Sequence, residues 1–159
     1  MAQTSAGLND STVKVALQAV LVGTPVLTLD GELPVEFVQP GDRILTRSGS
    51  RRVKQVEVSV VQNARVVKIS HDTLGVDRPS EDVTVSAGQQ ILIRDWRARA
   101  MFGATEAMIP AARLVDGEYI RAEVAAEARF FTLSFDEDAV IYAGGLELAC
   151  PALVRAKVV

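Results

Sequence analysis

Two residue types on which catalytic, metal and disulfide sites often depend are almost missing from this chain of 159 residues. It has one cysteine, Cys150, which excludes an internal disulfide framework. It has one histidine, His71, which excludes a metal site built from several histidines, and no cysteine–histidine cluster is present in the sequence. We therefore expect no metal ion and no other cofactor.

Aromatic residues and long apolar runs are also scarce. Aromatics make up 5% of the chain against 48% hydrophobic residues, so the core must be built mainly from Val, Leu, Ile and Ala. No uninterrupted apolar run approaches the ~20 residues that a membrane helix needs. The first ten residues have neither a basic start nor an apolar stretch, which is not typical of a secretory signal. The expected location is the cytoplasm, with incorporation into an exported or extracellular assembly as the alternative.

Neither sign of charge dominates. There are 17 basic and 20 acidic residues, a formal net charge of −3, which argues against electrostatically driven binding to nucleic acid. The length fits one domain with a substantial core. We expect a flexible arm over residues 1–12, a single domain over 13–159, and protein partners or self-assembly.

Alternating patterns rich in β-branched residues dominate the chain and predict many short strands. Residues 72–82 have the composition of an exposed loop, and residues 95–114 are expected to form the one short helical or looped excursion. Residues 52–68 are expected to form two strands separated at Gln62-Asn63. The other expected strands are 13–19, 25–29, 43–47, 83–86, 90–94, 119–124 and 129–134. This pattern predicts an all-β fold.

Several short motifs lie in a specific order and spacing over residues 13–151. The motifs are Gly23-Thr24, Thr28-Leu29-Asp30-Gly31-Glu32, Pro34-Val35-Glu36, Pro40-Gly41-Asp42 with Leu45-Thr46-Arg47, Val83-Thr84-Val85-Ser86, Arg94-Asp95-Trp96-Arg97, Pro110-Ala111 with Leu114-Val115-Asp116-Gly117, and residues 131–135 leading into Ala143-Gly144-Gly145. This set resembles the bacterial Hedgehog/intein (Hint) family of self-cleaving domains, and the resemblance implies a compact all-β domain of that type.

The chemistry implied by that resemblance needs residues that this chain has replaced. A cysteine or serine attacks the preceding carbonyl, and a Ser/Thr-x-x-His element polarises that carbonyl and protonates the leaving amine. The nucleophile position is Ala19 here, and the element corresponds to residues 86–89, from Ser86 to Gln89. An amide has no proton to exchange near neutral pH. Two further positions where the family often has histidine are Thr132 and Asp138.

Other reactive or charged residues have simpler interpretations. Ser86 has no base supplied by the sequence and is expected to bond local backbone. Cys150 is expected to be buried and inert, and His71 to be a surface turn residue beside an aspartate. The acidic run 136–138 lacks the spaced pattern of a cation-binding loop and is expected to be a solvated turn.

The strongest candidate for a partner-binding surface surrounds the single tryptophan. Tryptophan and arginine are enriched at binding hot spots. An alternative is that the tryptophan only pins this segment to the sheet while the arginines face water. The candidate residues are Arg94, Trp96, Arg97 and Arg99.

Together these features favour a non-catalytic Hint-like module that serves a structural or protein-interaction role, as a subunit of an assembly such as a virion, injection device or surface appendage. A strand at 13–19 is a candidate for pairing with a partner. The alternative is an enzyme with residual self-cleavage through Ser86 or another hydroxyl such as Thr24. A third possibility is a small-molecule binding module in the cleft of the vacated site.

Overall fold

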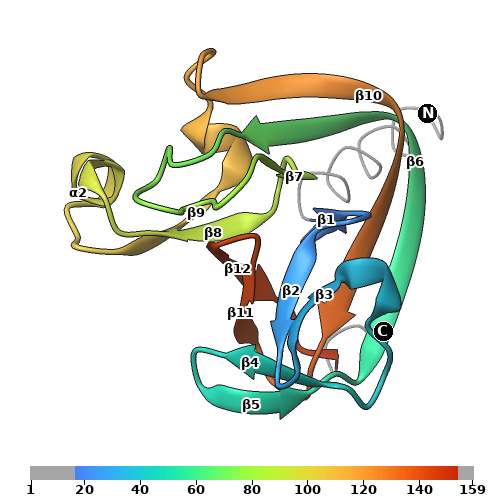
Figure 1. Ribbon diagram of the computed structural model, residues 1–159. Coiled ribbons are helices and arrows are strands. Elements are labelled where there is room, and N and C mark those ends of the chain that lie inside the picture. Colours follow the sequence, from blue (N-terminus) through green and yellow to red (C-terminus); the bar gives the residue numbers. More distant parts are fainter. Residues whose placement is uncertain (1–16, 154–159) are drawn as a thin grey trace, which may run out of the picture.

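The computed structural model describes residues 17–153 and shows an all-β fold with twelve strands and one short α-helix in that range (Figure 1). The expected arm at 1–12 and most of the strand expected at 13–19 lie outside the described residues. Residues 17–19 form no strand, and β1 (Val20–Leu21) begins after them. The all-β prediction is confirmed.

The longest element pair of the molecule is an antiparallel hairpin. β6 (Gln55–Ile69) pairs antiparallel with β10 (Ile120–Ser134) over its whole length. At one end β7 (Val83–Ser86) pairs with both β6 and β1, and β1 pairs with β10, so these four strands close a small barrel. The segment before Val20 therefore enters the fold at the seam between β7 and β10.

The predicted breaks at the centre of both hairpin strands were wrong. Residues 62–63 were expected to separate two strands, and residues 125–128 to separate two others. Most residues at the centre of the hairpin are exposed, so polar residues are tolerated there. The two strands stay paired through this polar stretch. Gln62 Nε2 donates to Glu127 Oε1 at 3.0 Å, while Asn63 takes a φ of +50° within the strand.

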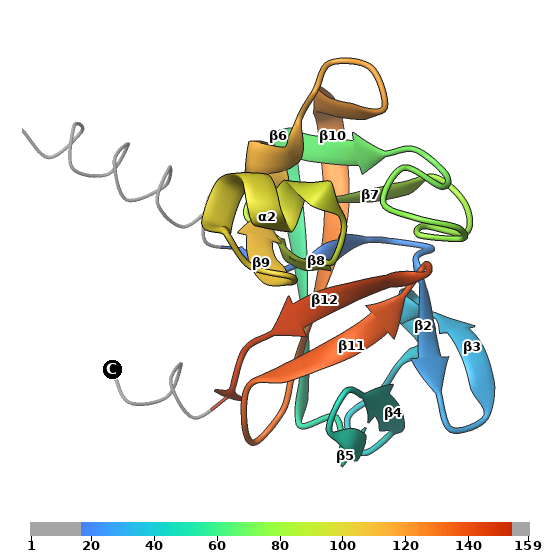
Figure 2. The same ribbon diagram turned by 90° about the vertical axis from the view of Figure 1, so that its left-hand side faces the viewer.

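The second sheet lies against the open half of this hairpin, and Figure 2 shows its central pair β11 and β12 crossing in front of it. Its order is β3-β2-β4-β11-β12-β8-β9, with β5 beside β4. The strands are β2 (Pro25–Thr28), β3 (Gly31–Pro34), β4 (Arg43–Thr46), β5 (Gly49–Arg52), β8 (Gln90–Ile93), β9 (Ala107–Pro110), β11 (Ala139–Ala143) and β12 (Leu146–Cys150).

The excursion expected at 95–114 contains a helix, a strand and a 3-10 turn. The helix α2 (Trp96–Phe102) begins where the Asp95 side chain accepts a hydrogen bond from Arg97 N, and ends at Gly103 in the left-handed conformation. β9 follows, and then the 3-10 helix η2 (Ala111–Leu114). A further 3-10 turn, η1 (Val35–Phe37), follows β3.

Aliphatic side chains fill the core between the two sheets, as the composition predicts. Residues from both sheets, among them Ile44, Val85, Ile91, Leu148 and Phe131, form one cluster. A smaller cluster lies at the seam where the chain enters, and it includes Ala19. Its other members are Ala64, Val66, Ala128 and Phe130.

A buried carboxylate ties the second sheet to the segments around it. The side chain of Glu147 in β12 is 3% exposed and contacts three guanidinium groups. Arg78 and Arg94 approach Glu147 Oε1 at 3.0 and 2.8 Å, and Arg47 approaches Oε2 at 3.3 Å. Arg78 also donates to Leu92 O at 3.1 Å. These contacts connect β12 with residues just after β4 and β8 and with the loop 70–82.

That loop also depends on a glycine at the turn between β11 and β12. Gly145 has a φ of +86°, and a Cβ there would overlap Asp77 O and approach Ser80 N to 2.8 Å. Neighbouring Gly144 O accepts a hydrogen bond from Ser80 N at 3.1 Å. A glycine is therefore required where the loop packs on the turn.

Candidate functional site

Four of the five positions implicated by sequence come together where the chain enters the fold. Ala19 precedes β1 and is 1% exposed. Ser86 ends β7 and Thr132 lies in β10, the two strands that flank β1. Gln89 follows β7 and is 2% exposed. The site is thus assembled by strand pairing around the peptide that links Gln18 to Ala19.

Three successive carbonyls of this segment accept hydrogen bonds from the site. Ser86 Oγ donates to Leu17 O at 2.7 Å, and Ser86 N donates to Ala19 O at 3.1 Å. Between them, Thr132 Oγ1 donates to Gln18 O at 2.8 Å. Gln18 O is the carbonyl that a nucleophile at position 19 would attack. Here it faces a hydroxyl donor, while Ala19 presents only a methyl group.

The side chain of Gln89 is fixed as a hydrogen-bond donor. Its Nε2 lies 2.9 Å from both Gln90 O and Ala149 O, and 3.2 Å from Gln18 Oε1. An amide nitrogen carries two hydrogens, so two of these three acceptors share one hydrogen. Because the group neither gains nor loses a proton near neutral pH, this position binds and orients but performs no acid–base step.

Gln18 is a site residue that the sequence analysis missed. Its Oε1 accepts from Gln90 N at 2.9 Å, and its Nε2 donates to Gly88 O at 2.9 Å. The side chain therefore bonds the backbone of the segment after β7 much as a neighbouring strand would. The only signal in the sequence was its place directly before Ala19, at the peptide bond that the family chemistry concerns.

No hydroxyl at the site has a base beside it among residues 17–153. Ser86 Oγ is engaged with Leu17 O, and Thr24 Oγ1 donates to Leu21 O at 2.7 Å. The one histidine, His71, lies two residues after Ile69. Ile69 pairs with Val83, at the opposite end of β7 from Ser86. Within this part of the chain, the hydrogens of both hydroxyls are therefore held by main-chain carbonyls.

Asp138 lies apart from the four clustered residues but borders the same opening. Its Oδ1 accepts from Ala152 N at 2.9 Å. A cavity of about 380 Å³ opens beside the site and is lined by Gln18, Gln90, Asp138 and Cys150 among others. Cys150 is buried, as expected, and this burial raises the pKa of its thiol to about 12, so the sulfur stays protonated.

The candidate partner-binding residues lie on and around α2. Trp96 is 69% exposed, and the Arg97 guanidinium lies 4.8 Å from the centre of its ring while also pairing with Asp95. Arg94 instead points to Glu147 and Glu106. Within the described part of the chain Arg99 makes no ion pair and lines a cavity of about 280 Å³ with Arg94 and Trp96. Trp96 is therefore exposed rather than pinned to the sheet, and its role in binding stays a prediction.

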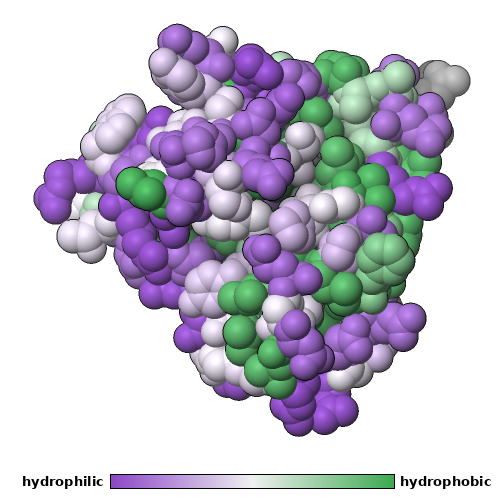
Figure 3. All heavy atoms as spheres, viewed as in Figure 1, coloured by the Kyte–Doolittle hydropathy of each residue, from purple (hydrophilic) through white to green (hydrophobic). Residues whose placement is uncertain are grey.

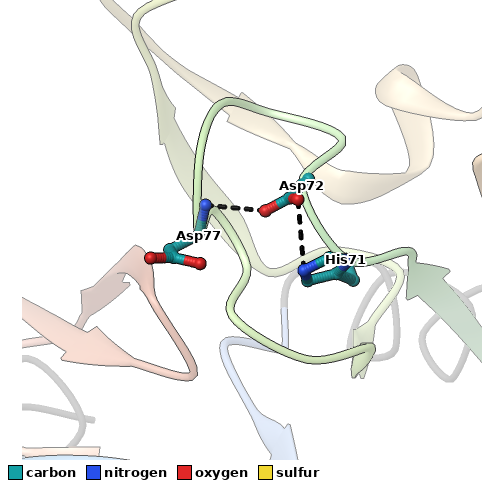
Figure 4. A group of neighbouring side chains, drawn as sticks. All are labelled: His71, Asp72 and Asp77. Carbon is teal, nitrogen blue, oxygen red and sulfur yellow. Dashed lines mark hydrogen bonds and ion pairs between the residues drawn. The ribbon is translucent and has the colours of Figure 1, made fainter.

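His71, Asp72 and Asp77 gather in the loop after β6, with ligand atoms within 4.8 Å of one another (Figure 4). His71 Nε2 lies 3.1 Å from Asp72 Oδ2, and Asp77 N donates to Asp72 Oδ1 at 2.7 Å. All three side chains are exposed. Both oxygens of Asp72 thus stabilise the turn of this loop, and we assign the group that structural role.

Comparison with known proteins places these features in context. The family model described as Hint domain matches residues 19–150. The bacterial intein-like domain from Clostridium thermocellum is similar in structure, with a TM-score of 0.63 at 14% identity, covering 85% of this chain and 99% of that one. The TvoVMA intein gives 0.60 at 13% identity (82% and 96%), and the gp41-1 intein gives 0.55 at 13% (82% and 96%). Curated proteins yield no match.

Proposed function

The chain belongs to the Hint domain family, and from that premise we propose that it is a member that no longer processes itself and serves as a structural or protein-interaction module within a larger assembly. One observation carries the proposal. The carbonyl of Gln18, which self-cleavage would attack, is bonded by Thr132 Oγ1 beside the methyl group of Ala19. The likeness to inteins, at identities below a fifth, supports the fold alone.

The residues at the positions of the family's reaction centre support a role in holding the segment 17–19 in place. Cleavage needs a nucleophile, a proton acceptor and a proton donor for the leaving amine. This chain has Ala19 at the nucleophile position, Gln89 at the position of the histidine that protonates the leaving amine, and Thr132 at a further histidine position. Gln89 and Thr132 both donate hydrogen bonds to Gln18, and Ser86 bonds the carbonyls of Leu17 and Ala19. The site therefore keeps the segment ahead of β1 attached and fixes where it enters the fold.

The surface around α2 supports the interaction half of the proposal. Tryptophan and arginine carry much of the energy at protein interfaces, and here Trp96 is exposed and Arg99 makes no ion pair with another residue of the 17–153 range. Among residues 17–153, no helix is long and apolar enough to cross a membrane. Because tryptophan and arginine are enriched at protein interfaces, we favour a protein partner for this surface, in an assembly such as a virion, an injection device or a surface appendage.

Intact mass measurement of the full chain tests the proposal. After incubation with and without thiol or hydroxylamine, we expect one species of 17.1 kDa. Fragments that begin at or near Ala19 would overturn the proposal in favour of residual self-cleavage, and their loss in Ser86→Ala would assign the nucleophile. The double variant Ala19→Cys/Gln89→His, run beside Ala19→Cys alone, shows that the assay detects cleavage when nucleophile and acid are restored. Native mass measurement of protein isolated from its source then tests for an assembly.

A further inference from the structure

One side of β6 has no strand beside it over much of its length. β10 pairs with β6 from Gln55 to Ile69, whereas β7 pairs with the other side only from Val66 to Ile69. Within the described residues, the side of β6 that faces away from β10 therefore has no strand partner between residues 55 and 65. Figure 1 shows β6 as the outermost strand on the right. Such an edge presents backbone donors and acceptors to any strand of suitable sequence.

The other strand edges in residues 17–153 carry features that discourage pairing. β3 and β9 are four residues long and end in proline, and β5 carries Arg51 and Arg52. The open side of β10 carries three charges in seven residues, namely Arg121, Glu123 and Glu127. By contrast, residues 58–64 of β6 form an uncharged run of seven. Short length, proline and charge are three usual protections of an edge, and this run lacks all three. Asn63, with a φ of +50°, is the one residue of the run that departs from extended backbone.

Apolar side chains are exposed on the same run. Val58 is 53% exposed and Val60 is 52% exposed, although valine is a strongly strand-forming residue that packs well against a neighbouring strand. Figure 3 shows hydrophobic residues gathering down the right-hand side of the view, where β6 and β10 run. A strand added along β6 would cover both valines.

Two opposite charges at the ends of the run indicate which strand fits. Glu57 and Arg65 are both exposed, and neither makes an ion pair with another residue of the described chain. If a second β6 lies antiparallel along the edge, centred on Val61, Glu57 faces Arg65 of the second copy. The two-fold symmetry makes the same contact twice. Opposite charges directly across two strands stabilise the pairing.

We propose that two copies of this chain associate by antiparallel pairing of β6 along residues 57–65. The two hairpins then join into one continuous sheet, β10-β6 of one copy followed by β6-β10 of the other. This inference rests on the proposed role as an interaction module and names a second copy as its partner. Val61 lies on the symmetry axis, and Arg65 is the last residue of β6 before β7 occupies the edge.

Sedimentation equilibrium of the full chain over a concentration series tests this pairing. We expect a monomer–dimer equilibrium in the wild type. Glu57→Arg and Arg65→Glu each place like charges opposite one another at two points, so each is expected to raise the dimer Kd about tenfold or more. The charge-swapped Glu57→Arg/Arg65→Glu variant recreates both opposite-charge contacts and is expected to restore the wild-type Kd. Because both side chains are exposed, circular dichroism should show unchanged folding.

Three results would overturn the inference: a monomer at every concentration, a dimer that neither single reversal weakens, or a double variant that fails to recover. Failure of this inference is distinct from failure of the proposed function. A chain that stays intact in the mass measurement but sediments as a monomer contradicts only the pairing, whereas cleavage near Ala19 contradicts only the non-processing role.

Discussion

At the scale of single residues, the proposed loss of self-processing rests on the kind of hydrogen that each side chain at the site holds. A histidine exchanges its proton, whereas the Gln89 amide keeps both hydrogens in fixed bonds to Gln90 O, Ala149 O and Gln18 Oε1. Thr132 likewise holds its hydroxyl hydrogen on Gln18 O. The same positions that would move protons in a reaction here hold two segments of chain together.

Replacing Gln89 by leucine, which is similar in size, should therefore be costly. Gln90 O and Ala149 O lose a buried donor, and we expect the free energy of unfolding to fall by about 2–4 kcal/mol in urea denaturation. Gln62→Leu is the matched control, because Gln62 makes one exposed bond to Glu127, and we expect a change within about 0.5 kcal/mol. Equal effects of the two substitutions would contradict the role assigned to Gln89.

At the scale of elements, short alternating segments were predictable because each has a buried and a less buried face. β2 and β7 follow the expected ranges to within a residue. The centre of the long hairpin was not predictable, because Gln62 and Asn63 resemble turn residues locally and only their partners on β10 keep them in a strand. β9 was missed for a related reason: its neighbour β8 is supplied from another part of the chain.

The site shows the same division between local and distant information. Ala19, Ser86, Gln89 and Thr132 could be located from a family pattern, since each belongs to a short motif. The contact between Gln18 and the backbone at Gly88 and Gln90 depends on two segments about 70 residues apart, which no local pattern encodes.

Glu147 provides a prediction at this scale, because its carboxylate connects β12 with the segments after β4 and β8 and with the loop 70–82. Glu147→Gln removes the charge that Arg47, Arg78 and Arg94 surround, and we expect the free energy of unfolding to fall by about 3 kcal/mol. Glu106→Gln, whose side chain is 44% exposed in the same network, should cost less than about 1 kcal/mol. Chemical denaturation of the two variants side by side measures the difference. A smaller loss for Glu147→Gln than for Glu106→Gln would show that the buried carboxylate is not the centre of the network.

At the scale of the whole molecule, the buried thiol links global stability to alkaline pH. The folded state holds the pKa of Cys150 at about 12, against an ordinary value of 9.0, because burial disfavours the thiolate. The folded state thus binds its proton more tightly than the unfolded state. Stability from this group is complete below pH 9 and is lost as the pH rises toward 12.

We therefore expect the unfolding free energy of the wild type, compared with Cys150→Ala, to fall by about 1.4 kcal/mol for each pH unit above 9. The difference between the two proteins isolates the thiol from tyrosine and lysine titration. Urea midpoints measured at pH 8 and pH 10 supply the values. Cys150 should also resist alkylation at pH 8 until the protein unfolds, and rapid labelling of the native state would contradict its burial.

The three carbonyl bonds at residues 17–19 also have a mechanical meaning. Tension on the chain ahead of Leu17 would load the bonds from Ser86 and Thr132 to these three carbonyls together, because the carbonyls belong to adjacent residues. Hydrogen bonds that are loaded together share the applied force. They therefore resist a larger force than the same bonds loaded one at a time. On the proposed role, the site is an anchor for the chain that enters the fold at residues 17–19.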